Sequence, residues 1–178
     1  RPKGSGFPNK ASSPIAGAAS PSSASEIRET LRDRALALGF DAIGFAPAVL
    51  GEMAKAGLRD YLARGYHGDM GWLSGERRAD PRLMWMEARS AIVLGLNYGP
   101  ADDPLAGLAA KERANISVYA RGRDYHDVMK PRLKVLARWF AERTGGEVKV
   151  FVDTAPLMEK PLAMQAGLMP LIASEQGA

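Results

Sequence analysis

Short apolar runs alternate with amphipathic segments along most of this chain, and that alternation limits the folds open to it. Strand-like runs lie at 40–46, 90–99, 115–120 and 148–152. Helical patterns lie at 23–38, 50–64, 125–143 and 156–167. Strands separated by helices indicate an α/β or α+β domain.

Capping residues mark several of the predicted boundaries. Ser23 and Glu26 form the S-x-x-E pattern of a capping box at the start of the first helix, and Gly39 ends that helix. The pair Gly145-Gly146 ends the helical pattern at 125–143. Pro156 suits the first turn of the last predicted helix, because its missing N–H is not needed there. These signals place the start of ordered structure at residue 23.

The ends of the chain differ in composition from its middle. Residues 1–22 are mainly Ser, Ala, Gly and Pro, so we expect a disordered tail that cannot bury enough apolar surface to offset its ordering entropy. One folded domain is expected over 23–168, followed by a tail at 169–178. The whole chain has 178 residues, which is too few for two large domains.

Composition excludes several classes of protein. The chain has no cysteine, which excludes disulfides, a thiolate nucleophile and an iron–sulfur cluster held by this chain alone. The apolar runs are too short to span a bilayer and no signal-peptide pattern is present, so we expect a cytoplasmic protein without a membrane partner. The net charge of +4 is compatible with a nucleic-acid partner but does not by itself indicate one.

The run "VKVFVD" ends abruptly on Asp153. One interpretation makes Asp153 a helix N-cap, a role for which aspartate is favoured. The other makes it functional, because ligand sites in α/β sheets gather at the carboxyl ends of strands and a partly desolvated carboxyl group there can donate a proton. The residues alone leave both interpretations open.

A second polar cluster, "RGRDYHD", follows the predicted strand at 115–120. It can be a solvated strand-to-helix turn with Asp124 as the helix cap. It can also be a site, because arginine side chains suit phosphate or carboxylate groups and His126 can donate a proton. The arginines concerned are Arg121 and Arg123, and Tyr125 stands beside the histidine.

A glycine-rich stretch, "GYHGDMGWLSG", contributes His67, Asp69 and Trp72. It is typical either of a surface loop or of a flexible wall over a large, flat ligand. The chain has no H-E-x-x-H spacing and no dinucleotide or Walker loop, so we predict no metal held by side chains.

Four blocks in order, "GYHGDMGWL", "RRADPRL…EARSAIVLGLNY", "ISVYARGRDYHDVMKPRLKVL" and "VFVDTAPLMEKPLAMQAGL", resemble the N-terminal half of bacterial epoxyqueuosine reductases. The resemblance covers roughly residues 25–168. It implies a nitroreductase-like domain, with a mixed sheet flanked by helices, that binds cobalamin. It also implies reduction of epoxyqueuosine to queuosine at the wobble position of tRNA, with the anticodon stem-loop as partner.

The same resemblance assigns roles to single residues. Asp153 is implied to be the proton donor, and Arg78 and Ser117 match positions that line the corrinoid site. Asp124, Tyr125 and His126 match the region that faces cofactor and substrate. A monomer is expected.

The chain departs from the family after "AGL", where "MPLIASEQGA" replaces the usual continuation into cysteine-rich cluster motifs. The family's two [4Fe–4S] clusters therefore have no ligands here, and we expect a truncated chain that lacks an internal electron donor. Two other functions stay open: a non-catalytic remnant that binds a corrinoid or RNA, and a nitroreductase-like oxidoreductase that uses FMN.

Overall fold

The computed structural model describes residues 23–103 and 105–168, so the predicted tails at 1–22 and 169–178 fall outside the described residues. At its centre lies an antiparallel pair of strands, β1 (Ala42–Pro47) and β2 (Ser90–Gly95). The register sets Ala42 against Gly95 and Pro47 against Ser90. Asp41 caps the end of the pair, because its carboxylate accepts a hydrogen bond of 2.6 Å from the N–H of Asn97.

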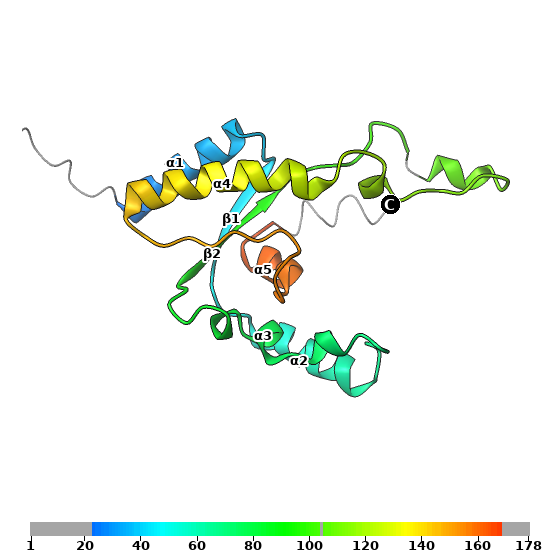
Figure 1. Ribbon diagram of the computed structural model, residues 1–178, viewed down its shortest axis with the longest axis horizontal. Coiled ribbons are helices and arrows are strands. Elements are labelled where there is room, and N and C mark those ends of the chain that lie inside the picture. The colour runs from blue at the N-terminus through cyan, green and yellow to red at the C-terminus, as the bar shows by residue number, and fades with distance from the viewer. Residues whose placement is uncertain (1–22, 104, 169–178) are drawn as a thin grey trace, which may run out of the picture.

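Helices cover both faces of this sheet (Figure 1). Alternate residues of a strand point to opposite faces, so Ile43 and Phe45 share one face and Gly44 lies on the other. Ile43 and Phe45 pack with α1 (Ala24–Ala37) and α4 (Tyr125–Thr144), while α5 (Glu159–Gln165) packs against the Gly44 face. The shorter elements are α2 (Glu52–Ala63), α3 (Glu76–Ala79), η1 (Gly71–Ser74), η2 (Pro81–Leu83), η3 (Ala106–Ala109) and η4 (Val118–Ala120).

The predicted capping signals are confirmed at both long helices. Ser23 accepts from the N–H of Glu26 at 3.2 Å, and the Glu26 carboxylate accepts from the N–H of Ser23 at 2.8 Å, which completes the capping box of α1. Helix α4 ends at Gly145, whose φ of 68° is the left-handed cap that glycine adopts without a steric penalty.

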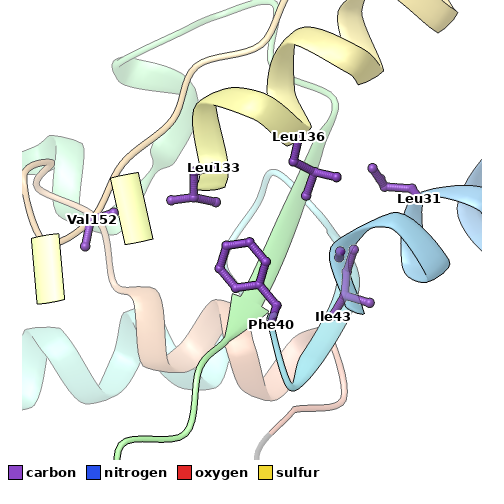
Figure 2. Packing of buried hydrophobic residues seen from close by; sticks show 7 residues of the cluster. Leu31, Phe40, Ile43, Leu133, Leu136 and Val152 are labelled. Atoms are coloured by element: carbon purple, nitrogen blue, oxygen red, sulfur yellow. The ribbon is translucent and has the colours of Figure 1, made fainter. Parts of the chain in front are cut away.

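One apolar cluster joins α1, the sheet and α4. Figure 2 shows Phe40 between Leu133 and Leu136 of α4 and Ile43 of β1, with Leu31 of α1 beside them. Val152 completes the cluster from the segment that follows α4, and only 5% of it is exposed. Burial of such side chains stabilises the fold by about 1.5–3 kcal/mol each.

Close contact between β1 and α5 depends on Gly44. A Cβ atom at Gly44 would lie 2.3 Å from the carbonyl oxygen of Ala166, the residue that ends α5. The amide of Gln165 also donates to the carbonyl oxygen of Val49 at 3.0 Å. The helix is therefore fixed to the strand and to the loop that leaves it.

Two predicted strands are wrong. Residues 115–117 are irregular and 118–120 form η4, because the side chain of Arg121 donates to the carbonyl oxygen of Ile116 and to the side chain of Asn115, each at 2.7 Å. Residues 148–152 are irregular and pair with neither strand of the described sheet. Val152 is nevertheless buried. The apolar pattern therefore predicted the burial of this segment correctly, but it was wrong to predict a strand paired in a sheet.

The predicted mixed sheet is also wrong within the described residues, where the strands pair only antiparallel. The coarser prediction of an α+β domain is confirmed. The last helix begins at Glu159 and not at Pro156. In the described part of the chain, no helix combines the length and the apolar character needed to cross a bilayer.

Candidate functional site

Asp153 lies at the boundary between the core and the solvent. Its neighbour Val152 is buried in the core, whereas Asp153 is exposed. Its φ of 51° is left-handed, and it is the one residue other than glycine with positive φ in the described ranges. Aspartate tolerates this conformation better than most residues, but it still carries strain of a kind that clusters at functional sites.

Tyr125 and Asp153 are in direct contact. The tyrosine hydroxyl donates a hydrogen bond of 2.5 Å to Oδ2 of Asp153, although 28 residues separate the two in the sequence. This hydrogen bond, followed by burial and the charge of Asp153, raises the pKa of Tyr125 to about 12. The contact follows from the fold, since Tyr125 begins α4 and Asp153 follows the segment packed beneath it.

Asp124 and His126 form the rest of this edge. The Asp124 carboxylate is the N-cap of α4 and accepts from the backbone N–H of His126 at 2.9 Å. The same oxygen lies 2.8 Å from Nδ1 of the His126 ring. These two hydrogen bonds, the backbone one first, lower the pKa of Asp124. The His126 ring stacks on the ring of Tyr125 with centroids 4.2 Å apart, so Asp124 holds His126 against the tyrosine.

Glu159 is a member of the site that the sequence analysis missed. It is half-buried at the first position of α5, and the charge of Asp153 affects its pKa. Burial, the charge of Asp153 and a hydrogen bond to the Asp153 side chain raise the pKa of Glu159, in that order of size. The sequence analysis started the last helix at Pro156, and in such a helix Glu159 would be an ordinary acidic residue of the first turn. An acidic residue directly after the Asp153 loop was the available signal.

Arg78 lies at a cavity, and none of the described residues that line it belongs to the group around Asp153. Its guanidinium carbon is 4.6 Å from the centroid of the Trp72 ring, and its Nε is buried without a hydrogen-bond partner. Arg78 lines a cavity of about 440 Å³ together with apolar residues of α2, Leu73 and Met158. Met158 directly precedes Glu159, so the loop 154–158 connects the carboxylates to the wall of this cavity.

The glycine-rich stretch forms the turn between α2 and η1. Trp72 lies in η1 and 62% of it is exposed, and Asp69 is exposed in the turn. His67 is half-buried, with Nδ1 buried and unpartnered. Among the residues that the structure describes, no three His, Asp or Glu side chains are grouped as metal ligands.

Ser117 is the N-cap residue before η4 and is exposed, and its hydroxyl makes no N-cap hydrogen bond. It belongs to the segment between β2 and α4, which Figure 1 shows reaching away from the sheet. Arg123 is exposed, whereas Arg121 is committed to its own turn through its hydrogen bonds to residues 115 and 116. The structure thus brings Asp124, Tyr125, His126 and Asp153 together and leaves Ser117 and Arg78 apart from that cluster.

The chemistry available at the cluster is proton transfer. Asp153 is exposed and can reach a ligand, while the hydroxyl of Tyr125 holds its carboxyl group in position. A carboxyl group held in this way, within reach of a reacting oxygen, can act as a general acid.

Comparison with known proteins relates this arrangement to one family. The sequence profile described as epoxyqueuosine reductase QueG, DUF1730, matches residues 78–154, a region that contains every cofactor-site residue named from the sequence. The epoxyqueuosine reductase of Pseudomonas aeruginosa is 37% identical over 163 residues, and the match covers 87% of this chain and 44% of that protein.

Solved structures agree in fold. The epoxyqueuosine reductase from Streptococcus thermophilus superimposes with a TM-score of 0.64 and 25% identity, over 79% of this chain and 38% of that one. A crystal structure of epoxyqueuosine reductase with a tRNA-Tyr epoxyqueuosine-modified stem loop gives 0.61 and 24%, over 80% and 38%. The chain spans less than half the length of these relatives. Over that part of their length, in sequence and in fold, this chain is a relative of the epoxyqueuosine reductases.

Proposed function

We propose that this chain carries the acid residue and part of the cofactor wall of a cobalamin-dependent enzyme that reduces epoxyqueuosine to queuosine at the wobble position of tRNA. The single observation that carries the proposal is the hydrogen bond between Tyr125 and Asp153, in a chain related to that family. Asp153 gives its proton to the epoxide oxygen as a carbon–oxygen bond breaks, and Tyr125 holds the carboxyl group at the required angle.

The cavity at Arg78 fits part of a corrinoid. Its walls are mostly apolar side chains, and the one orphaned donor on them is the buried Nε of Arg78. A corrinoid presents a flat apolar ring whose rim carries amide groups, and an amide carbonyl oxygen would satisfy that donor. When bound, cobalamin supplies electrons of low potential, which no protein side chain provides.

The remaining residues of the proposal have supporting roles. Trp72 and Arg78 would form the wall against the ring, and Asp124 would keep His126 on the substrate side of Tyr125. Ser117 stays a proposed cofactor contact on the basis of the family resemblance alone. The tRNA partner is proposed from the solved epoxyqueuosine reductase that holds a tRNA stem loop and from the net charge of +4, which favours a phosphate backbone.

The first test measures cofactor binding. The purified chain is titrated with cobalamin and separately with FMN, and the absorbance spectrum of each cofactor is followed. We expect cobalamin to bind and Arg78→Met to weaken binding about 10- to 100-fold, because a charged donor contributes about 1.5–3 kcal/mol. Arg77→Met is the control, since Arg77 is an exposed neighbour on the same helix. Binding of FMN in place of cobalamin would support the nitroreductase-like alternative.

The second test measures the acid. The chain is loaded with pre-reduced cobalamin, mixed anaerobically with epoxyqueuosine-containing tRNA, and queuosine is measured by mass spectrometry in a single turnover. Asp153→Asn keeps the shape of the side chain and removes the proton, so we expect the rate to fall about 10²–10⁴-fold while cobalamin binding persists. An unchanged rate would reduce Asp153 to a structural role. Queuosine formed in neither protein would favour the non-catalytic remnant.

A further inference from the structure

Helix α2 forms one side of the cavity at Arg78, yet it buries none of its own residues. Ala54 and Leu58 of this helix line the cavity, and so does Met158, directly before α5. All of α2 is described, and no residue of it counts among the buried ones. Figure 1 shows α2 near the bottom of the view, away from the layer of α1 and α4. Apolar burial therefore does not fix this wall of the cavity, and its position has to depend on other interactions.

The side chain of Gln165 joins the end of α5 to the start of α2. Its amide nitrogen donates to the carbonyl oxygen of Val49 at 3.0 Å, and its amide oxygen accepts from the N–H of Gly51 at 3.3 Å. Gln165 is the last residue of α5, and Gly51 is the N-cap residue of α2. The two hydrogen bonds fall on either side of Leu50, of which only 1% is exposed. Both polar groups of one side chain thus hold the same short segment.

Gln165 does for α2 what a residue of the same helix does for α1. In α1 the carboxylate of Glu26, the third residue of the helix, accepts from the N–H of the N-cap residue Ser23. The third residue of α2 is Ala54, whose methyl group cannot accept a hydrogen bond. A longer side chain at that position would extend from the cavity wall that Ala54 lines. A partner on α5 therefore keeps the wall small while the N–H of Gly51 is still satisfied.

The other end of this connection is firmly packed. Helix α5 lies against β1 at Gly44, where a Cβ atom would be 2.3 Å from the carbonyl oxygen of Ala166. Leu162 and Ala163 of α5 are buried, each with 5% exposed. Gln165 therefore links a helix that is fixed by packing to one that is not fixed by its own burial.

We propose that Gln165 is a positioning residue for the cavity at Arg78: by tying α2 to α5, it sets the width of the space that receives a flat apolar ring. The identity of the ring as a corrinoid rests on the proposed function, whereas the link between the two helices does not. Gln165 is not among the described residues that line the cavity, so it acts on a ligand only through the position of α2. Without the link, α2 moves and the cavity takes several widths, so a ligand has to select the one that fits and binds less tightly.

The first experiment measures the position of α2 without any ligand. Since the chain has no cysteine, Arg59→Cys on α2 and Glu142→Cys on α4 place two spin labels at exposed positions, and pulsed electron–electron double resonance measures the distance between them. We expect one narrow distance distribution in the labelled parent and a clearly broader one once Gln165→Ala is added. Met164→Ala, at the exposed neighbouring residue, is the control and should leave the distribution narrow. A broad distribution in the parent, or equal widths with and without Gln165→Ala, would overturn the inference.

The second experiment titrates the unlabelled variants with cobalamin and follows the absorbance spectrum. We expect Gln165→Ala to weaken binding about 3- to 10-fold, the range that corresponds to the loss of a hydrogen bond, and Met164→Ala to match the parent. Equal affinity in Gln165→Ala and a parent that binds cobalamin refutes the positioning role, even where α2 has become mobile. A parent that binds no cobalamin refutes the proposed function instead, and the distance measurement then decides the role of Gln165.

A second substitution separates positioning from helix stability. Gly51 has φ of −65° and ψ of 155°, and an added Cβ there would meet no described atom within 4 Å. Serine therefore fits at this N-cap and can accept a hydrogen bond from the first turn of α2. We expect Gly51→Ser in the Gln165→Ala background to restore stability in urea denaturation, while the weak cobalamin binding and the broad distance distribution persist. Recovery of tight binding together with stability would show that Gln165 is only a helix cap and would refute the positioning role.

Discussion

Gly44→Ala is expected to loosen α5 and with it the candidate site. The added Cβ would lie 2.3 Å from the carbonyl oxygen of Ala166 and 2.8 Å from its Cβ, whereas protein Cβ atoms essentially never approach other atoms closer than 3.0 Å. Helix α5 would have to withdraw by about 0.7 Å to restore that separation. The nearest obstacle is backbone, so no change of side-chain rotamer relieves the overlap.

The expected cost follows from that geometry. Overpacking a tight contact costs about 1–3 kcal/mol, and a backbone obstacle favours the upper end. Withdrawal of α5 also opens the packing of Leu162 and Ala163, each 5% exposed. A loss of about 3 kcal/mol corresponds to a change of about 10²-fold in the folding equilibrium constant.

Urea denaturation of the chain measures this loss, and Gly95→Ala is the matched control. Gly95 lies in the paired strand, where an added Cβ would meet the Cβ of Ala42 at 3.4 Å, an ordinary contact. We expect Gly95→Ala to change the free energy of unfolding by less than about 1 kcal/mol. If Gly44→Ala and Gly95→Ala unfold at the same urea concentration, the close packing of α5 on β1 is refuted.

Three further predictions concern the cap and the carboxyl cluster. Ser23→Ala removes the capping box of α1 and should cost about 1 kcal/mol in urea denaturation, whereas Ser25→Ala, at an exposed residue outside the capping pair, should not. Tyr125 should still be protonated near pH 11 by ¹³C NMR of its ring, because its pKa is about 12, and Asp153→Asn should return its titration toward 10.0. Glu159 has a raised pKa in the folded state, so the stability it contributes is present below the ordinary glutamate pKa and is lost as pH rises through the folded-state value. Glu159→Gln should therefore match the parent in acid and be the more stable protein at neutral pH, and the reverse order would contradict the burial of Glu159 beside Asp153.

Local signals predicted the long helices well. Ser23, Glu26 and Gly39 marked the first helix, and Gly145 marked the end of α4, because these features depend on neighbours within a few residues. Pro131 did not interrupt α4, since it lies in the second turn and the helix is supported by buried Leu133 and Leu136.

Strands were harder to predict because a strand depends on a partner elsewhere in the chain. Residues 90–95 have such a partner in β1, whereas 148–152 have the same apolar character without one in the described sheet. At 115–120 a side chain decided the outcome, since Arg121 closes the turn through two hydrogen bonds. Periodicity carries no information about such a contact.

In the candidate site, too, single residues could be predicted from the sequence and contacts between distant segments could not. The sequence analysis singled out Asp153 and Tyr125 separately. In the structure, the hydroxyl of Tyr125 lies 2.5 Å from Oδ2 of Asp153. Glu159 was missed because its raised pKa depends on burial and on the charge of Asp153, and both arise only in the folded chain. A contact of this kind depends on the tertiary fold and leaves no spacing rule in the chain.

Because the backbone of Asp153 is left-handed, selection for stability and selection for activity favour different residues at position 153. With φ at 51°, glycine would occupy position 153 without steric penalty, whereas aspartate pays about 1 kcal/mol for it. Heat-challenged libraries of this chain should therefore enrich Asp153→Gly, and libraries sorted for queuosine formation should discard it. The frequency of that one codon change would report which pressure a population has experienced.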